Sequence, residues 1–579
     1  LSFPTLSLIN GFCLGGGLEM SLACDYRIAL DDPKTRLGLP EVLLGIHPGW
    51  GGTVRLTRLI GAPAAMDLML SGRTVNARAA KKMGIVDKIT AQRHLKRAAK
   101  MLILRRPEKS KPGKLTSLAS SNVARPLLAK YLRKQVAKRA PEAHYPAPYA
   151  LIDLWEKYGG DEGSMLREEA ASVAELMTEG TAQNLVRVFL LQERLKSLGK
   201  GIDFQPQHVH VIGAGIMGGD IAAWCAFKGM TVTLQDREPK FIAPAIKRAH
   251  ALFKKRLKLP HLVQAAKDSL IPDHKGLGVK NADVVIEAII ENKQAKQDLF
   301  SQIEPLLKPE TILATNTSSI PLDELSETLK QPDRLVGIHF FNPVAKMQLV
   351  EIVESNNTSQ DNKNKAAKFC RCIDRLPLPV KSSPGFLVNR ILMPYLMEAV
   401  KLLEEGVPGQ VIDKAATNFG MPMGPIFLAD TVGLDICLSV AEILGAALGL
   451  DVPDRLRKKV ETGELGVKSG QGFYQYQKGK QVKTKISTDS SSEQSEDIAD
   501  RLILKMLNEA IACLREGVIE EKDLLDVGMI FGTGFAPFRG GPMHYMEHRG
   551  RQVIVDRLKE LEGQYGERFA ADAGWKTVS

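Results

Sequence analysis

His339 and Glu351 have the residue types and spacing for acid–base chemistry. His339 ends an apolar run, RLVGIH, and Glu351 lies in the next one, MQLVEIV, with the turn FNPVAK between them. If the chain folds back at this turn, the carboxylate can bind one imidazole nitrogen and raise the basicity of the other. The pair would then act as a general base that removes a hydroxyl proton while a hydride leaves the same carbon. On spacing alone, a satisfied core histidine beside an unrelated glutamate stays an open alternative.

Three glycines have the spacing of a dinucleotide site. Gly213, Gly215 and Gly218 form G-x-G-x-x-G after the apolar run HVHVI and open a helix-like segment, IMGGDIAAWCAFKG. The first glycine permits a tight turn, the second lets the backbone approach a pyrophosphate, and the third lets the helix pack on the strand. The helix N-terminus then faces the phosphates. The alternative is that these glycines serve only turns and packing.

Asp236 ends the next apolar run, MTVTLQD. A carboxylate there accepts hydrogen bonds from the adenosine ribose and repels a 2′-phosphate, so NAD is favoured over NADP. The adjacent Arg237 weakens that preference, and the motif alone does not exclude FAD.

Two glutamates suggest a second site. Glu19 follows Gly15-Gly16-Gly17 at the start of a predicted helix, and Glu41 lies in the loop LPEVLLG. Two carboxylates can divide the acid and base roles in adding water across a polarised double bond. Backbone N–H groups at the glycine-rich helix start can stabilise an enolate on a thioester oxygen. A helix-capping glutamate and a surface glutamate are the alternatives.

The elements that must position these residues change along the chain. Residues 1–90 alternate short apolar strands with glycine-rich turns and helices, and 91–205 have helical spacing that predicts a connector. Residues 206–382 alternate apolar strands with helix-length segments, which predicts a doubly wound parallel sheet. After Ser383-Pro384-Gly385 the pattern is mostly helical.

The helical part contains an internal duplication. RILMPYLMEAVKLLEEGV from Arg390 matches RLILKMLNEAIACLREGV from Arg501, and a Gly/Pro turn follows each. We therefore predict two related helical domains, 383–480 and 498–579. The polar, serine-rich stretch between them predicts an exposed, flexible linker over 481–497.

Composition limits the classes of protein. The 579 residues are 44% apolar and 25% charged, as in a globular protein of several domains. The longest apolar stretch is too short to cross a bilayer, so no transmembrane segment is expected. Seven scattered cysteines suit reduced thiols in a cytoplasmic protein. Cys370 and Cys372 lack a second pair or histidine cluster, so no metal is expected.

The net charge of +12 is concentrated in residues 93–139. A solvated basic face explains it most simply. A contact for the phosphates of a nucleotide-tailed thioester, or docking onto a partner surface, are the alternatives. Nucleic-acid binding is not expected, because no recognised binding motif accompanies the charge.

Several motifs together resemble a known family. GAGIMG, VVIEAIIEN, ATNTSSI, GIHFFNPV, LVEIV and SPGFLVNR occur in the order seen in 3-hydroxyacyl-CoA dehydrogenases. With the segment in front, nearly the whole chain resembles the α-subunit of bacterial multifunctional fatty-acid oxidation complexes. The resemblance implies oxidation of (S)-3-hydroxyacyl-CoA to 3-oxoacyl-CoA with NAD.

The resemblance also implies roles for residues of this chain. His339 would be the acid/base catalyst, Glu351 its orienting partner, and Ser318 and Asn389 would hold the substrate near the nicotinamide. The positions that match family residues around the dinucleotide are Met217, Asp236, Ile289, Ile290, Glu291, Lys296, Ser318 and Asn342. Where some relatives carry a substrate-contacting tyrosine, this chain has Phe531, so a hydroxyl contact is expected to be missing.

The first segment resembles the crotonase family, through INGFCLGGGLEMSLACDYRIA and LPEVLLGIHPGWGGTVRL. On that resemblance Glu19 and Glu41 are the catalytic pair for hydrating trans-2-enoyl-CoA, and Gly16 supplies one oxyanion-hole N–H. The spacing between the glutamates is two residues longer than in many short-chain relatives. Because the chain opens at Leu1 inside a strand-like segment, we expect an N-terminally truncated unit whose hydratase is weak or inactive, although a full-length parent would have it.

The predicted architecture is α/β and multidomain. It combines a partial crotonase-like ββα spiral, a helical connector, a Rossmann-type NAD domain and two duplicated all-α dehydrogenase C-terminal domains. A non-catalytic scaffold that binds NAD or CoA for a thiolase partner is the alternative function. The resemblance implies acyl-CoA thioester substrates, a thiolase β-subunit in a hetero-oligomer and a cytoplasmic location, and it leaves open an accompanying isomerase or epimerase activity.

Overall fold

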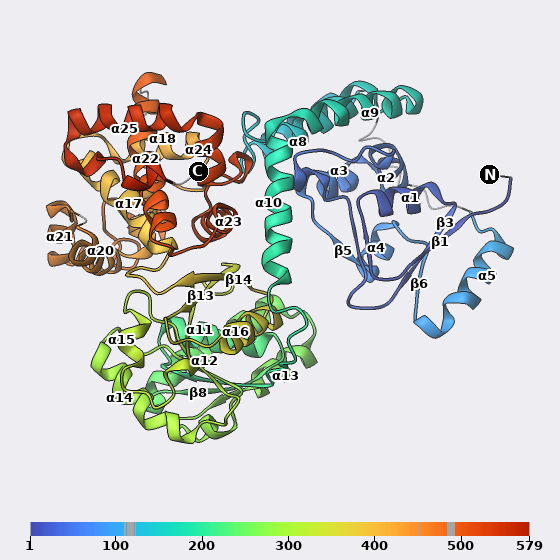
Figure 1. Cartoon of the computed structure of the whole chain (residues 1–579). Coiled ribbons are helices and arrows are strands. Elements are labelled where there is room, and N and C mark those ends of the chain that lie inside the picture. Colours follow the sequence, from blue (N-terminus) through green and yellow to red (C-terminus); the bar gives the residue numbers. More distant parts are fainter. Residues whose placement is uncertain are drawn as a thin grey trace. The chain divides into compact units, whose positions relative to one another are not determined.

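The chain divides into two compact units, Leu1–Phe189 and Leu190–Ser579 (Figure 1). The structure is a computed structural model and describes residues 2–108, 112, 121, 123–449, 451–482 and 492–577. Each unit combines helices with sheets, so the predicted multidomain α/β class is confirmed.

The first unit contains two small sheets. One is parallel, in the order β1-β3-β6, and the other has the order β2-β4-β5. The strands are β1 (Leu6–Ile9), β2 (Phe12–Leu14), β3 (Tyr26–Leu30), β4 (Arg36–Gly38), β5 (Val75–Asn76) and β6 (Lys88–Thr90). All five residues of β3 are buried, as expected for a central strand covered on both faces.

Helices surround these sheets and continue beyond them. They are α1 (Gly16–Ala23), α2 (Gly52–Ile60), α3 (Ala62–Ser71), α4 (Ala77–Met83), α5 (Leu95–Arg105), α7 (Arg125–Val136), α8 (Ala147–Tyr158), α9 (Glu162–Thr178) and α10 (Gly180–Ser197), with 3-10 turns at Glu41–Leu44 and Gln92–His94.

The predicted connector over 91–205 is not a separate part of the fold. Ala129, Trp155 and Met165 belong to the same buried cluster as Leu18 and Leu68. The helices after residue 91 supply the apolar surface that the small sheets and short helices need to complete one core. Three lysines of the predicted basic region, Lys109, Lys111 and Lys114, lie outside the described residues.

The second unit is built on an eight-stranded sheet in the order β14-β13-β12-β11-β10-β7-β8-β9. Its strands are β7 (His208–Ile212), β8 (Thr231–Gln235), β9 (Leu270–Pro272), β10 (Val284–Glu287), β11 (Ile312–Thr315), β12 (Leu335–Phe340), β13 (Leu349–Glu354) and β14 (Leu376–Lys381). Six neighbouring strands of the sheet, β12, β11, β10, β7, β8 and β9, are parallel. The chain starts at β7 and adds strands on both of its sides. This is the predicted doubly wound arrangement.

Both faces of this sheet are covered. Val284 and Ile286 of β10 point into one buried cluster with Trp224 and Phe253, and Val285 points into another with Phe300. The sequences of such strands are continuous apolar runs, because side chains on both faces of the sheet are buried. The helices around the sheet are α11 (Ile216–Phe227), α12 (Pro239–Arg256), α13 (Pro260–Asp268), α14 (Lys293–Ile303), α15 (Leu322–Ser326) and α16 (Gln360–Cys372), with 3-10 turns at Leu277–Asn281, Glu304–Leu306 and Pro332–Arg334.

The rest of the second unit is helical. It contains α17 (Val388–Glu404), α18 (Gly409–Phe419), α19 (Pro425–Val432), α20 (Leu434–Leu448), α21 (Asp454–Glu461), the short strands β15 (Tyr476–Gln477) and β16 (Lys480–Gln481), α22 (Ser492–Arg515), α23 (Lys522–Thr533), α24 (Pro542–Arg549) and α25 (Arg551–Tyr565), with 3-10 turns at Pro537–Arg539, Glu567–Phe569 and Ala573–Lys576. Within the described ranges no single helix is long and apolar enough to cross a membrane, and only α19 and α20 together, bent by 101°, meet the length and composition test.

The duplicated sequences form equivalent structures. The long helices α17 and α22 pack against each other, and a shorter helix follows each. Asp413 of α18 accepts hydrogen bonds from the first N–H groups of α19, and Asp526 of α23 does the same for α24. The same carboxylate cap therefore sets the turn in both repeats.

The predicted linker is too long at both ends. Gln481 ends β16 and residues 492–497 begin α22, while 483–491 lie outside the described residues. Polar composition predicted a linker through residue 497, but the last six of these residues have enough helix-forming types to extend the amphipathic helix that follows.

Candidate functional site

His339 and Glu351 face each other across the antiparallel strands β12 and β13. They are direct partners in the strand register, and His339 Nδ1 lies 2.7 Å from Glu351 Oε2. Glu351 is fully buried and His339 is 5% exposed. A hydrogen bond at Nδ1 fixes the tautomer and leaves Nε2 as the nitrogen that can accept a proton. The fold-back of the chain thus brings the predicted pair together.

The second oxygen of Glu351 is held by a helix start. Glu351 Oε1 accepts hydrogen bonds from Leu387 N at 3.2 Å and from Val388 N at 2.9 Å, at the N-terminus of α17. A helix N-terminus carries a partial positive charge and unpaired N–H groups. The carboxylate is therefore fixed on both sides, and it orients the imidazole rigidly.

Aromatic rings surround the imidazole. The ring of Phe341 lies edge-on to His339 at 4.6 Å between centroids, and that of Phe386 at 5.5 Å. The imidazole is thus packed against apolar rings, and hydrogen bonds in such surroundings are stronger than in water.

The glycine turn after β7 has the shape that a pyrophosphate requires. Gly213 has φ of +103°, and a Cβ on Gly218 would lie 1.9 Å from Gly213 O. A Cβ on Gly215 would meet nothing within 4 Å, so the space above this glycine is open. Met217 lies half-buried in the first turn of α11. The geometry of the turn thus fits NAD. Gly213 and Gly218 close the turn, and Gly215 leaves room for phosphate.

Asp236 lies against this turn. Its Oδ2 accepts a hydrogen bond from Ala214 N at 2.7 Å, and its Oδ1 accepts one from Arg237 N at 2.7 Å. The carboxylate is therefore at the edge of the phosphate cradle, where the adenosine ribose of NAD would be held.

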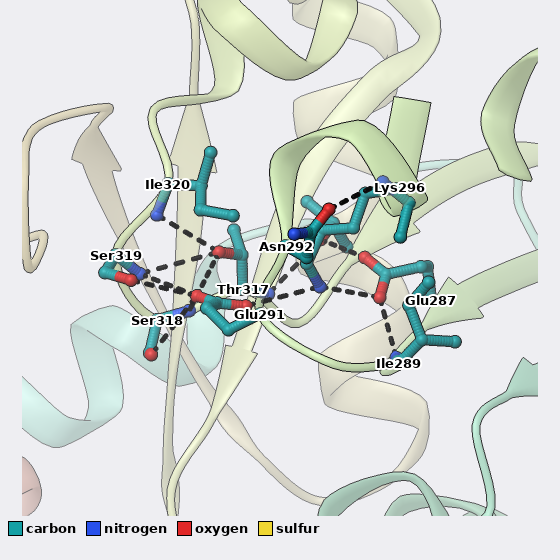
Figure 2. A network of polar contacts seen from close by, with 11 residues as sticks. Glu287, Ile289, Glu291, Asn292, Lys296, Thr317, Ser318, Ser319 and Ile320 are labelled. Carbon is teal, nitrogen blue, oxygen red and sulfur yellow. Dashed lines mark hydrogen bonds and ion pairs between the residues drawn. The ribbon is translucent and has the colours of Figure 1, made fainter. Parts of the chain in front are cut away.

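A buried network joins the ends of β10 and β11 (Figure 2). Glu287 is fully buried and accepts hydrogen bonds from Ile289 N at 2.7 Å, Lys296 Nζ at 2.6 Å and Thr315 Oγ1 at 2.6 Å. Lys296 Nζ also lies 3.3 Å from Glu291 Oε2. A buried charge is tolerated only when it is paired and hydrogen-bonded, and both conditions are met here.

Glu291 connects this network to the following loop. Its Oε1 accepts hydrogen bonds from Thr317 Oγ1 at 2.6 Å, Ser318 N at 2.9 Å and Ser319 Oγ at 3.0 Å. Burial acts to raise the pKa of Glu291, but the Lys296 ammonium and these hydrogen bonds outweigh it, so the pKa lies below its usual value. Glu291 thus holds the loop that carries Ser318 against the loop after β10.

Lys296, one of the predicted cofactor contacts, lies inside this network. Its side chain is 1% exposed and its ammonium is directed at Glu287 and Glu291. Ile290, by contrast, is 71% exposed and Ile289 is half-buried, so these predicted contacts present apolar surface beside the network.

The remaining predicted residues lie in the loops after β11 and β12 and at the start of α17. Ser318 is half-buried in the loop after β11, and Asn342 is exposed just after β12. Asn389 is half-buried in the first turn of α17, next to Val388, whose N–H binds Glu351. The loop after β11 contacts the end of β12 through Asn316, and the start of α17 contacts Glu351 through Val388.

In the first unit, the side chain of Glu19 extends from α1 to the start of α2. Glu19 is 3% exposed, and its Oε1 accepts hydrogen bonds from Trp50 N and Gly52 N, each at 2.8 Å. Gly52 is closely packed on it, because a Cβ there would lie 2.7 Å from Glu19 Oε1. Its carboxylate is therefore held by backbone donors at a helix N-terminus.

Glu41 lies on the other side of the glycine-rich turn. Its Oε1 would be 3.2 Å from a Cβ on Gly15, and within the described residues neither carboxylate oxygen has a hydrogen-bond partner. Burial raises the pKa of Glu41 to about 7, and the negative charges of Glu19 and Glu169 add to this effect. A buried carboxyl with no partner can bind a water or a substrate group, and its pKa suits proton transfer near neutral pH.

Gly16 begins α1, where the first N–H groups have no partner within the helix. A Cβ on Gly16 would lie 2.7 Å from the ring of Trp50, so a larger residue would require this ring to move. The predicted oxyanion donor is thus at a helix start between the two glutamates. Phe531, the position predicted to lack a hydroxyl, is half-buried in α23 of the other unit.

Glu169 of α9 was missed by sequence reasoning. It is fully buried; its Oε1 accepts a hydrogen bond from Gly51 N at 2.5 Å, and its Oε2 accepts one from Thr53 Oγ1. Together, Glu19 and Glu169 bind three successive backbone amides, because Trp50 N and Gly52 N donate to Glu19 and Gly51 N donates to Glu169. The signal was present in the sequence, because Glu169 interrupts the apolar face that Met165 and Leu176 define at helical spacing.

Three family models match the chain. The model of the 3-hydroxyacyl-CoA dehydrogenase NAD binding domain matches residues 208–383, that of the 3-hydroxyacyl-CoA dehydrogenase C-terminal domain matches 385–476, and that of enoyl-CoA hydratase/isomerase matches 1–139. The range of the NAD binding domain contains His339 and Glu351, and the range of enoyl-CoA hydratase/isomerase contains Glu19 and Glu41.

Curated relatives are similar along almost the whole chain. A fatty acid oxidation complex subunit alpha of Vibrio cholerae is 38% identical over 601 residues, covering 100% of this chain and 84% of the relative. One of Shewanella loihica is 36% identical over 598 residues, covering 98% and 84%.

Two solved structures each match about two thirds of the chain. A 3-hydroxybutyryl-CoA dehydrogenase of Escherichia coli has a TM-score of 0.57 at 27% identity, covering 65% of this chain and 98% of that one. The dehydrogenase part of multifunctional enzyme 1 of C. elegans has a TM-score of 0.51 at 27% identity, covering 68% and 97%.

Proposed function

The chain belongs to the family of fatty acid oxidation complex α subunits, and we propose that its two sites hydrate trans-2-enoyl-CoA and oxidise the resulting (S)-3-hydroxyacyl-CoA with NAD. The observation that carries the oxidation is the His339–Glu351 pair at the edge of an NAD-binding sheet. The protein is thus an oxidoreductase and a lyase of fatty-acid β-oxidation.

His339 is the base of the oxidation. Its Nε2 accepts the proton of the 3-hydroxyl as the C3–H bond breaks, and the C3–O bond becomes a carbonyl. The imidazolium that forms is stabilised by Glu351 at Nδ1. NAD, when bound, supplies the carbon that accepts the hydride from C3. Ser318 and Asn389 align the substrate hydroxyl with His339, so the protein's share of the rate comes from positioning and proton transfer.

Glu19 and Glu41 serve the hydration. Water gives its hydroxyl to C3 and a proton goes to C2, so one carboxylate must accept a proton and the other must supply one. Glu19, held by two backbone amides, is suited to the base role, and Glu41, with a pKa of about 7, to the acid role. The Gly16 N–H supports the negative charge on the thioester oxygen.

The test is the formation of NADH from (S)-3-hydroxyacyl-CoA and NAD, compared with NADP in place of NAD. Turnover with NAD, and much less with NADP, supports the proposal, because Asp236 repels a 2′-phosphate. No turnover in a protein that still binds NAD would contradict it and favour a non-catalytic scaffold.

The partner and location are further parts of the proposal. The relatives' name describes one subunit of a complex, and a thiolase β-subunit would consume the 3-oxoacyl-CoA that this chain produces. Light scattering of the two proteins mixed tests this, and separate masses would contradict it. A cytoplasmic location fits the seven free cysteines, five of which are buried.

A further inference from the structure

Glu287 and Thr315 are direct partners in the register of β10 and β11, at the ends from which the site loops leave. Both side chains are fully buried, so neither reaches a substrate or cofactor. The Thr315 hydroxyl donates to Glu287 Oε2 at 2.6 Å. The other carboxylate oxygen accepts hydrogen bonds from Ile289 N and Lys296 Nζ (Figure 2).

This contact lies between two loops that carry predicted NAD and substrate residues. Glu287 fixes Ile289 directly and Glu291 through Lys296. Thr315 also accepts a hydrogen bond from Thr317 N at 3.2 Å, and Thr317 and Ser318 bind Glu291. The two loops are thus connected by a closed circuit of hydrogen bonds, which holds its members more firmly than separate bonds would.

The same loop reaches the strand of the catalytic histidine. Asn316, the residue after Thr315, accepts a hydrogen bond from Phe340 N at 2.9 Å, directly after His339. A shift of β11's end relative to Glu287 would therefore move Ser318 and the end of β12 together.

We propose that Glu287 and Thr315 are positioning residues of the dehydrogenase, which hold the loop after β10 and the loop of Ser318 in the geometry that aligns NAD with the substrate hydroxyl. The inference rests on the proposed oxidation. It assigns the pair a role beyond the stability that any buried hydrogen bond provides.

Thr311 provides a matched control. It lies just before β11 and is 1% exposed, and its hydroxyl donates one hydrogen bond to Ala282 O at 2.7 Å. Thr315→Val and Thr311→Val thus delete the same group from opposite ends of one strand. Each variant loses one buried hydroxyl donor, so a difference between them in cofactor binding and in local exchange reports the position of the lost group.

The experiment measures three quantities for the wild type, Thr315→Val, Thr315→Ser and Thr311→Val. They are the dissociation constant of NADH by fluorescence, the KM values for NAD and for 3-hydroxyacyl-CoA, and amide hydrogen exchange of the protein without NAD. Thr315→Val should weaken NADH binding and raise the KM for NAD roughly ten-fold, the scale of a lost hydrogen bond to a charged group. It should also speed exchange at the amides of Ile289 and Ser318.

Thr315→Ser, which keeps the hydroxyl, and Thr311→Val should bind NADH as the wild type does. Equal NADH affinity and equal exchange in Thr315→Val and Thr311→Val would overturn the inference and leave the pair with a stabilising role only. Failure of the wild-type protein to bind NADH would contradict the proposed function itself, so the two failures are distinguishable.

Discussion

Buried carboxylates in this chain have different roles because their partners differ. Glu351 has three partners, an imidazole and two helix amides, and it orients His339. Glu41 is also removed from water, but within the described residues its oxygens have no partner. Environment, and not residue type, therefore separates an orienting group from a proton donor.

Glu41 should make stability depend on pH. Its pKa is raised to about 7, so between the usual carboxyl pKa near 4.3 and about 7 the folded state keeps a proton that the unfolded state has released. The free energy of unfolding of the first unit should therefore fall as pH rises through this window. Glu41→Gln, which resembles the protonated form, should avoid the loss and be more stable than wild type by up to about 3 kcal/mol near pH 8.

Urea unfolding at about pH 4 and about pH 8 checks this. The control is Glu175→Gln, a change at an exposed glutamate of α9 in the same unit. The advantage of Glu41→Gln should vanish near pH 4. An equal difference between the variant and wild type at both pH values would show that Glu41 does not titrate in this window.

Part of each site was predictable from residues alone. His339 and the three glycines stand at points where apolar runs end, and parallel strands bring such points to one edge. Glu351 lies inside the next apolar run, and the turn after His339 predicted that this run folds back beside it. Glu287 and Glu169 each interrupt an apolar pattern, which signals a buried carboxylate, but the sequence does not show which donors surround it. The burial of Lys296 was hidden for the same reason, because family likeness reports a position and not the direction of a side chain.

At the scale of elements, the two helical repeats exchange ion pairs reciprocally. Arg390 of α17 pairs with Glu509 of α22 and with Glu516 just after it, and Arg501 of α22 pairs with Glu398 of α17 and with Glu405 just after it. The four glutamates occupy corresponding positions in the duplicated sequences. The duplication was predictable from the repeated sequence, but the reciprocal pairing is a property of how the repeats pack.

Breaking one of these pairs should cost more than removing it whole. Arg501 is 2% and Glu398 2% exposed, so Arg501→Leu leaves a buried carboxylate with less compensation and should lower the free energy of unfolding by about 3–5 kcal/mol. Arg501→Leu with Glu398→Leu should recover much of that loss. Lys559→Ala, which breaks an exposed pair, should cost at most about 1 kcal/mol. Urea unfolding measures all three, and a double variant no more stable than Arg501→Leu would argue against a coupled pair.

At the scale of the whole molecule, each unit has its own buried core. The cluster of the first unit contains residues from Ile9 to Met165, and the sheet of the second is covered by two further clusters. The boundary of the first unit could not be predicted, because a helical pattern after residue 91 does not reveal which core its apolar face completes.

NADH should stabilise the second unit only. A ligand present at about 100 times its dissociation constant adds about 2.7 kcal/mol to the stability of the state that binds it. Amide exchange in β10 and β11 should therefore slow with NADH, while exchange in β3 of the first unit stays as it was. If NADH slowed amide exchange in β3 as much as in β10 and β11, the two units would not open independently.

The most direct test of the dehydrogenase site is the turnover of His339→Gln with (S)-3-hydroxyacyl-CoA and NAD, alongside its affinity for NADH. The exposed His261→Gln of α13 serves as the matched control. Loss of a general base should lower kcat by about 10²–10⁴-fold while NADH binds unchanged, and His261→Gln should retain wild-type turnover. Wild-type turnover in His339→Gln would contradict the assignment of His339 as the base.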